Sequence, residues 1–250
     1  SKTRLNKRAT FPMIILKTPK GWGGPKFVND LQVEGTFRSH QVPVVVNKEH
    51  PENLEILEAW LRSYKPEELF DENGTLKKEL KELAPKGNHR MGMNPHANGG
   101  LLLEELNIPD FRGYGVEVKN PGETISQDMM ELGYFIRDII KLNENKKNFR
   151  IFGPDEALSN RLNHVFEATN RQWNGIRYDN DEFISPYGRV IDSVLSEHLC
   201  EGMLEGYLLT GRHGFIHSYE AFIRIVDSMA SQHAKWLKVC NQLSWRQPIA

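Results

Sequence analysis

The feature of this sequence that most limits its fold is an alternation of strand-like and helix-like segments in the second half of the chain. One helix face is marked by apolar residues at helical spacing, namely Leu132, Phe135, Ile136, Ile139 and Ile140. The run from Phe149 to Phe152 has the composition of a buried strand, 189–195 alternates weakly as a second strand, and helical patterns cover 197–209 and 219–239. Strands that alternate with helices predict an α/β fold with a doubly wound parallel sheet.

The first half of the chain carries one apolar run and two helical patterns. Residues 11–16 form a nearly continuous, β-branched apolar run, which predicts a buried parallel strand. Helices are expected over 51–64 and 76–83. Residues 84–100 are rich in Pro, Gly, Asn and His and follow neither period, so we expect a connection between two domains there. Because the chain opens inside a strand-to-loop unit, we interpret it as an internal piece of a longer protein.

The charge balance argues against a strongly charged partner. The chain has 32 basic and 33 acidic residues, with a formal net charge of -1, so we expect neither nucleic acid nor a membrane surface as a partner. The longest apolar stretches are far shorter than the ~20 residues of a membrane-spanning helix, and the basic N-terminus lacks the apolar core of a secretion signal. Cys200 and Cys240 stand alone, without the spacing of a metal site or a disulfide framework. We therefore expect a cytoplasmic protein.

Three segments carry side chains suited to chemistry, and the first is the glycine-rich stretch 18–26. Its Lys20 is followed further along by His40. Glycines after a strand let the backbone approach a ligand closely, and a lysine with a histidine could hold phosphate oxygens. For this segment alone, a glycine-rich turn beside a solvated lysine is the simpler explanation.

The second segment follows the strand expected at 149–152. Gly153 to Glu156 predicts a turn and then the start of a helix, and Ser159, Asn160 and Arg161 come next. In parallel sheets, ligands bind beyond the carboxyl ends of the strands, and arginine suits phosphate by its bidentate geometry. The alternative for these residues alone is a capped helix start with a surface ion pair.

The third segment is a helical pattern with Glu197, Glu201 and Glu205 four residues apart on one face. Like charges at this spacing repel one another unless they are solvated or one of them is protonated. A solvated acidic face is the usual explanation. Gly202 and Gly206 in the same pattern lower helix stability and indicate close packing on a neighbour. We therefore expect this face to be buried.

Taken in order along the chain, these segments resemble the phosphoketolase family. The matching stretches are Pro19-Lys20-Gly21-Trp22, Arg38-Ser39-His40-Gln41-Val42-Pro43, Phe149-Arg150-Ile151-Phe152-Gly153-Pro154-Asp155-Glu156, Ser159-Asn160-Arg161-Leu162, Ser196-Glu197-His198 and Glu205-Gly206-Tyr207-Leu208-Leu209-Thr210-Gly211-Arg212-His213-Gly214. The resemblance covers practically the whole chain. It implies a thiamine diphosphate-binding fold, with the end of a pyrophosphate-binding domain and a linker in residues 1–98 and much of a pyrimidine-binding domain in 99–250.

The resemblance also implies a reaction. Phosphoketolases use thiamine diphosphate, held through Mg²⁺, to cleave xylulose 5-phosphate or fructose 6-phosphate with inorganic phosphate. The products are acetyl phosphate and glyceraldehyde 3-phosphate or erythrose 4-phosphate. In the family each active site lies between two subunits of a dimer, so a homodimer or higher oligomer of the full-length enzyme is expected.

The same resemblance assigns roles to six residues. Glu197 matches the glutamate that hydrogen-bonds the cofactor's aminopyrimidine ring, and Tyr219 matches an aromatic group against that ring. Lys20 and His40 match groups on the cofactor side, His40 being close to the reacting oxygens. Ser159 and Arg161 match groups that hold the sugar's phosphate. Glu197 and His40 are therefore the expected catalytic residues.

The sequence departs from the family pattern in two ways. Other residue types are expected at Gly23 and Leu199, and His217 stands at a position where the family varies. These differences bear on substrate or packing preference. In addition, no Gly-Asp-Gly segment with a downstream asparagine, which carries Mg²⁺ and diphosphate in this superfamily, occurs in the chain. We therefore expect no metal ligand here and place those ligands outside this chain.

Two other functions stay open from the sequence. A transketolase-like ketol transferase would share the fold and Glu197, although the Gly-Pro-Asp-Glu and Gly-Arg-His-Gly segments favour phosphoketolase. As an isolated piece, the chain could instead be a noncatalytic module that dimerises or binds an anion through Arg161, Arg212 and His213.

Overall fold

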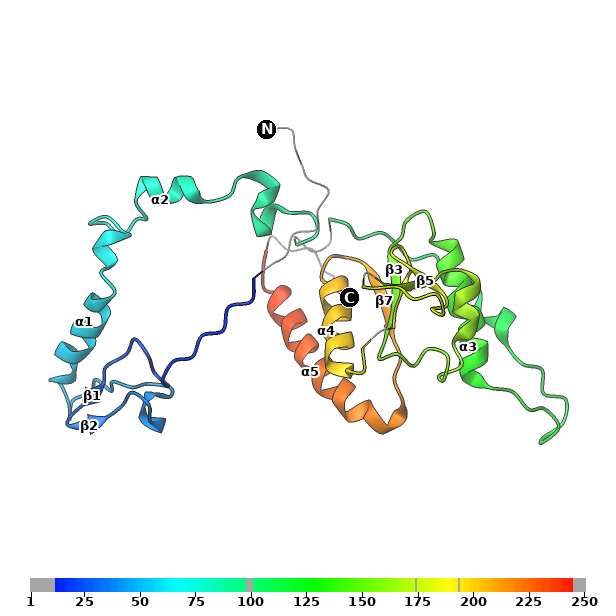
Figure 1. Ribbon diagram of the computed structural model, residues 1–250, viewed down its shortest axis with the longest axis horizontal. Coiled ribbons are helices and arrows are strands. Elements are labelled where there is room, and N and C mark those ends of the chain that lie inside the picture. The colour runs from blue at the N-terminus through cyan, green and yellow to red at the C-terminus, as the bar shows by residue number, and fades with distance from the viewer. Residues whose placement is uncertain (1–11, 98–100, 174, 193, 245–250) are drawn as a thin grey trace. The chain divides into compact units, whose positions relative to one another are not determined.

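The computed structural model describes residues 12–97, 101–173, 175–192 and 194–244, and the chain divides into two compact units, Ser1–Ala84 and Pro85–Ala250 (Figure 1). The boundary expected between residues 98 and 99 lies outside the described residues. The assignment of 1–98 and 99–250 to two cofactor-binding domains stays a prediction. Within the described residues, no helix combines the length and the apolar character needed to cross a bilayer.

The second unit is built on a five-stranded parallel sheet in the order β5-β4-β6-β3-β7. Its strands are β3 (Phe149–Gly153), β4 (Arg171–Gln172), β5 (Ile184–Ser185), β6 (Val190–Asp192) and β7 (His213–Ile216). Gly153 pairs with Asp192 on one side of β3, and Phe152 pairs with Ile216 on the other. The predicted α/β fold with a parallel sheet is confirmed, as are the strands expected at 149–152 and within 189–195.

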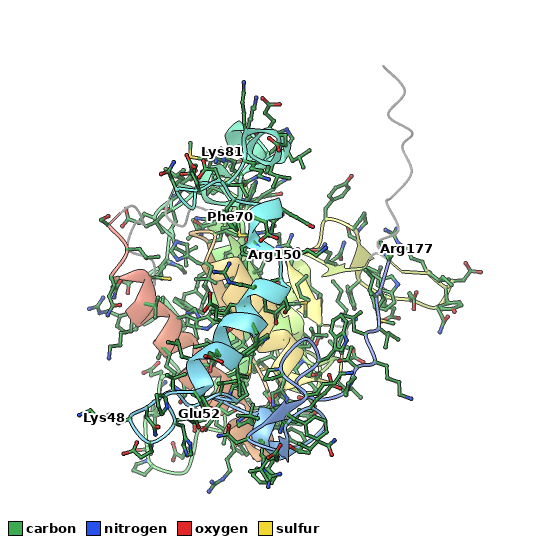
Figure 2. The ribbon with its side chains drawn as sticks, turned by 90° about the vertical axis from the view of Figure 1, so that its left-hand side faces the viewer. Lys48, Glu52, Phe70, Lys81, Arg150 and Arg177 are labelled. Atoms are coloured by element: carbon green, nitrogen blue, oxygen red, sulfur yellow. The ribbon has the colours of Figure 1, made fainter. Side chains whose placement is uncertain are left out.

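Helices cover both faces of this sheet (Figure 1). The main ones are α3 (Asp128–Leu142), α4 (Glu197–Leu208) and α5 (Ile223–Cys240). The unit also contains the short 3-10 helices η3 (Gly87–His89), η4 (Met91–Met93), η5 (Phe111–Tyr114), η6 (Asn163–Glu167) and η7 (Glu220–Phe222). Because side chains alternate along a strand, Phe149 and Ile151 pack with α3 in the main core. Arg150, labelled in Figure 2, and Phe152 point the other way and contact the Tyr207 ring of α4.

The first unit has little regular structure. It contains the antiparallel pair β1 (Phe27–Val28) and β2 (Leu31–Gln32), the 3-10 helices η1 (Phe37–Ser39) and η2 (Pro66–Glu68), and the helices α1 (Asn53–Ser63) and α2 (Lys78–Leu83). Figure 2 labels Glu52, the residue before α1, and Lys81 in α2. Trp60 Nε1 and Tyr64 Oη both donate to the Gly23 carbonyl, at 2.8 and 2.9 Å, and attach α1 to the glycine-rich stretch. Both helices expected in this half are confirmed.

Two local predictions are wrong. The run 12–16 forms no strand, and Met13 and Ile14 are 84% and 79% exposed; Phe11 lies outside the described residues. A strand needs a pairing partner for its backbone groups, and among the described residues of the first unit only β1 with β2, and Phe70 with Leu76 in an isolated bridge, are paired. The helix expected after Gly153 is also absent. Asp155 and Arg161 adopt left-handed φ angles of 61° and 62°, which a right-handed helix cannot accommodate, so the segment forms a turn.

Candidate active site

The strand ends of the second unit gather polar side chains at one edge of the sheet. Gly153 and Asp192 are directly paired, and the backbone N–H of His217 donates to the Phe152 carbonyl at 3.1 Å. The carboxyl ends of β3, β6 and β7 therefore lie at one level. This is the edge at which parallel sheets place their ligands.

Asp192, the last residue of β6, fixes the turn that follows β3. Its side chain is fully buried and accepts hydrogen bonds from the backbone N–H groups of Glu156 and Ala157, at 2.9 and 3.1 Å. Arg171 Nε forms an ion pair with Asp192 Oδ2 at 3.5 Å. Sequence reasoning did not select Asp192. An aspartate directly after the apolar pair Val190-Ile191 at a strand end was the available signal.

Two of the predicted site residues contact each other across this edge. The Tyr219 hydroxyl, from the segment after β7, donates a short hydrogen bond to Ser159 Oγ in the turn after β3. Ser159 Oγ in turn donates to the Glu156 carbonyl at 3.1 Å. Arg161 follows in the same turn with an exposed side chain. The residues expected to hold the sugar's phosphate and the expected aromatic group are thus brought together.

Glu197 is the first residue of α4, and it is half-buried. Ser196 caps the helix by accepting from the backbone N–H of Leu199 at 3.3 Å. The helix dipole favours a negative charge at this position. Ser218 Oγ donates to Glu197 Oε1 at 3.2 Å. Glu197 is therefore linked to the residue next to Tyr219, and so to the same edge of the sheet.

A second carboxyl group, that of Glu156, lies close to Glu197 and was not selected from the sequence. It is 9% exposed, and its Oε2 is buried without a hydrogen-bond partner in the part of the chain that the structure describes. Burial raises the pKa of Glu156, the charges of Glu197 and Asp192 raise it further, and hydrogen bonds from the Tyr219 backbone and the Asn160 side chain oppose the shift. The edge thus carries two neighbouring carboxyls in different environments, an arrangement suited to moving protons.

The expected burial of the α4 acidic face is confirmed for two residues. Glu201 and Glu205 are 6% and 4% exposed, and each has one buried oxygen that finds no hydrogen-bond partner among the described residues. Burial and the neighbouring Glu205 charge raise the pKa of Glu201. The close packing inferred from the glycines is not found, because a Cβ added at Gly202 or Gly206 would meet no atom of the described chain within 4 Å.

Lys20 and His40 lie in the first unit and line the same cavity, which has a volume of about 650 Å³. Both side chains are exposed. Gly21, with φ 77°, lies against Ser39, since a Cβ at this glycine would be 2.4 Å from Ser39 Cβ. This close approach brings the Lys20 and His40 segments together. The other cavity walls are largely apolar, with Val28, Leu31, Val33, Phe37, Val42 and Val45 among the lining residues.

Comparison with curated proteins finds close relatives over almost the whole chain. A probable phosphoketolase of Clostridium acetobutylicum is 66% identical over 97% of this chain and 31% of its own length. Probable phosphoketolase 2 of Rhizobium meliloti is 59% identical over 97% of this chain and 31% of its own length. A probable phosphoketolase of Rhodopirellula baltica is 59% identical over 97% of this chain and 30% of its own length. The chain therefore spans slightly less than a third of these relatives.

Two family models together match most of the sequence. The model described as D-xylulose 5-phosphate/D-fructose 6-phosphate phosphoketolase matches residues 130–250. The model of the N-terminal domain of the same family matches residues 1–102. With the parallel sheet and the relatives, these matches establish that the chain belongs to the phosphoketolase family.

Proposed function

We propose that this chain is an internal segment of a thiamine diphosphate-dependent phosphoketolase. The enzyme would cleave xylulose 5-phosphate or fructose 6-phosphate with inorganic phosphate, giving acetyl phosphate and a shortened aldose phosphate. One observation carries the proposal. Ser159, Glu197 and Tyr219, which come from three separate segments, converge at the carboxyl edge of a parallel sheet in a chain of this family.

The carboxyl groups at this edge fit the pyrimidine ring of the cofactor. Glu197 has one oxygen held by Ser218, and close to it Glu156 has a buried oxygen without a hydrogen-bond partner in the described chain. A ring nitrogen needs a hydrogen-bonding carboxyl in a largely apolar site, where burial favours the protonated form of the acid. Glu197 would hold that nitrogen and share a proton with it, and Tyr219 would lie against the ring. When bound, thiamine diphosphate supplies the electron sink for carbon–carbon cleavage.

The turn after β3 supplies groups for the sugar's phosphate. Arg161 is exposed, so its guanidinium can reach a ligand, and arginine binds phosphate through two parallel hydrogen bonds. The Ser159 hydroxyl accepts from Tyr219 and donates to the Glu156 carbonyl, and on substrate binding it would turn its proton toward a phosphate oxygen. Ser159 and Arg161 would position the substrate, and Glu197 would serve the cofactor.

In the first unit, Lys20 and His40 would act on the cofactor side. Their shared cavity places a cation and an imidazole beside apolar walls, a combination that suits phosphate oxygens on an otherwise apolar molecule. His40 would be a second catalytic residue, close to the reacting oxygens. We place the Mg²⁺ ligands outside this chain and propose a cytoplasmic enzyme that is a homodimer or a higher oligomer.

The test is product analysis with the full-length enzyme. Purified protein is incubated with fructose 6-phosphate, Mg²⁺ and thiamine diphosphate, and acetyl phosphate is measured as its hydroxamate. We expect acetyl phosphate to form when inorganic phosphate is the sole acceptor and to be absent when phosphate is omitted. Ketol transfer to an added aldose phosphate, without acetyl phosphate, would contradict the proposal and identify a transketolase-like activity.

A further inference from the structure

A buried histidine connects the segments of the candidate active site. His217 directly follows β7, is 4% exposed and has its ring against the backbone of Gly153. A Cβ at position 153 would lie 2.0 Å from His217 Nε2, a separation that no pair of nonbonded atoms tolerates. The imidazole therefore occupies space that only a glycine at the end of β3 leaves free.

The hydrogen bonds of the ring fix its tautomer. Asn160 Nδ2 lies 3.2 Å from His217 Nδ1, and because an amide nitrogen only donates, Nδ1 accepts. The ring proton is then on Nε2, which faces Asp192 Oδ1 at 3.9 Å and makes no hydrogen bond with the described residues. Burial lowers the pKa of His217, and the Asp192 charge opposes this shift.

His217 contacts Asn160 and Asp192, which adjoin or hold residues with proposed roles. Asn160 stands between Ser159 and Arg161 in the turn after β3. The Asp192 carboxylate accepts hydrogen bonds from two backbone N–H groups at the start of the same turn. In the sequence, His217 directly precedes Ser218 and Tyr219. Ser218 donates a hydrogen bond to Glu197, and Tyr219 donates one to Ser159. One ring therefore lies between the phosphate-binding turn and the segment that contacts the cofactor glutamate.

We propose that His217 is a positioning residue that holds the turn 156–161 against the Ser218–Tyr219 segment, and so sets where the sugar's phosphate lies relative to Glu197. This inference rests on the proposed function. Through its acceptor contact with Asn160, the ring keeps Ser159 and Arg161 in place without touching the substrate. The bond with Asn160, rather than the bulk of the ring, is what the position requires.

Two substitutions separate the hydrogen bond from the packing. In His217→Leu the side chain fills much of the ring volume but offers Asn160 no acceptor. In His217→Asn the amide oxygen takes a place close to that of Nδ1 and can accept from Asn160. His233→Leu is the matched control, since His233 lies half-buried on α5 and its ring nitrogens make no hydrogen bond with the described residues.

Steady-state kinetics of the full-length enzyme is the first readout. We expect His217→Leu to raise the KM for fructose 6-phosphate about 5- to 30-fold, the factor that a change of one to two kcal/mol produces. The affinity for thiamine diphosphate should change little. His217→Asn should recover most of the wild-type KM, and His233→Leu should leave it unchanged. Equal KM values in His217→Leu and the wild type, or in both His217 variants, would overturn the proposal.

Amide hydrogen exchange is the second readout and does not depend on activity. His217→Leu should accelerate exchange in the turn 156–161 more than elsewhere, and His217→Asn should not. If the wild-type enzyme forms no acetyl phosphate, the proposed function fails, while exchange still decides whether His217 holds the turn. Unchanged exchange in His217→Leu would remove the positioning role even in an active enzyme.

Discussion

At the scale of single residues, the site depends on how its environment distinguishes Glu197 from Glu156. Glu197 is half-buried at a helix N-terminus and accepts a hydrogen bond from a hydroxyl donor, Ser218. Glu156 is buried beside the charges of Glu197 and Asp192, which favours its protonated form. Two neighbouring carboxyls in different environments can serve as a proton donor and a proton acceptor. The pair is therefore suited to the tautomer exchange that the proposed chemistry requires.

The first prediction concerns Glu197→Gln in the full-length enzyme. An amide cannot exchange the proton at the cofactor's ring nitrogen, so kcat should fall ~10²–10⁴-fold, as for other lost acid–base groups. Initial rates of acetyl phosphate formation at saturating cofactor measure this loss. Glu220→Gln is the control, because Glu220 is exposed and lies outside the site contacts, and it should keep wild-type activity. Near-normal turnover in Glu197→Gln would refute the role of this glutamate.

The second prediction is a pH dependence of stability carried by Glu156. Its folded pKa is raised above the ordinary value of 4.5, so its contribution to stability is present below that value and is lost as pH rises through the folded pKa. Glu156→Gln removes the ionisation. We therefore expect this variant to gain stability relative to the wild type between acid and neutral pH, as measured by urea unfolding of the chain at each pH.

Glu167 provides a control of opposite sign. Hydrogen bonds from His164 and Arg137 lower the pKa of Glu167, so its contribution is present above the ordinary value and is lost as pH falls through the folded pKa. Glu167→Gln should therefore lose stability relative to the wild type as pH rises toward neutral. The same trend in both variants would contradict the assigned environments.

At the scale of secondary structure, the sequence predicted elements whose signal is local. The apolar spacing of α3, the apolar run of β3 and the helical pattern of α4 each lie within one segment and were found. The strands β4, β5 and β7 have two to four residues, too few for a period to show. The run 12–16 was misassigned because composition does not reveal whether a partner strand is present.

The residues of the candidate site also differ in whether a local sequence signal points to them. Glu197, Ser159 and Tyr219 were selected through the family resemblance, and their roles stay predictions. Asp192 and His217 make contacts with residues 35 to 57 positions away, and although the place of Asp192 at a strand end is visible in the sequence, the partners of both residues are not. The left-handed backbone at Asp155 and Arg161 was equally hidden, since non-glycine residues rarely adopt it. Long-range contacts therefore account for what was missed.

The third prediction compares two glycines in different elements. Gly153→Ala places a methyl group 2.0 Å from the His217 ring, so either β3 or the ring must move, at a cost of about 1–3 kcal/mol for an overpacked core. Gly202→Ala, within α4, meets no atom of the described chain within 4 Å and should add about 0.5–1 kcal/mol of helix stability. Urea unfolding of the chain should show opposite shifts in midpoint. A wild-type midpoint for Gly153→Ala would contradict the ring placement.

At the scale of the whole molecule, the proposed residues fall in two compact units. Lys20 and His40 lie in the first, and Ser159, Glu197 and Tyr219 lie in the second. The first unit has few buried residues, with Val33, Val44 and Asn53 as its buried side chains among those described. Much of its apolar surface, including Phe37 at 73% exposure, is therefore available to further protein. Since the chain spans about 31% of its relatives, we propose that other parts of the enzyme complete the site.

The last prediction is that this 250-residue chain alone forms no acetyl phosphate and binds thiamine diphosphate weakly. The groups matched to the cofactor's pyrimidine side are present, whereas the Gly-Asp-Gly segment that carries Mg²⁺ and diphosphate in the superfamily does not occur in the sequence. Without the metal, the strongest electrostatic attraction for the diphosphate is missing. Calorimetry should therefore give similar affinities for thiamine and thiamine diphosphate with this chain, and a clear preference for the diphosphate with the full-length enzyme. Much tighter binding of the diphosphate by the chain, or robust turnover at a confirmed mass, would show that the diphosphate site lies within these residues.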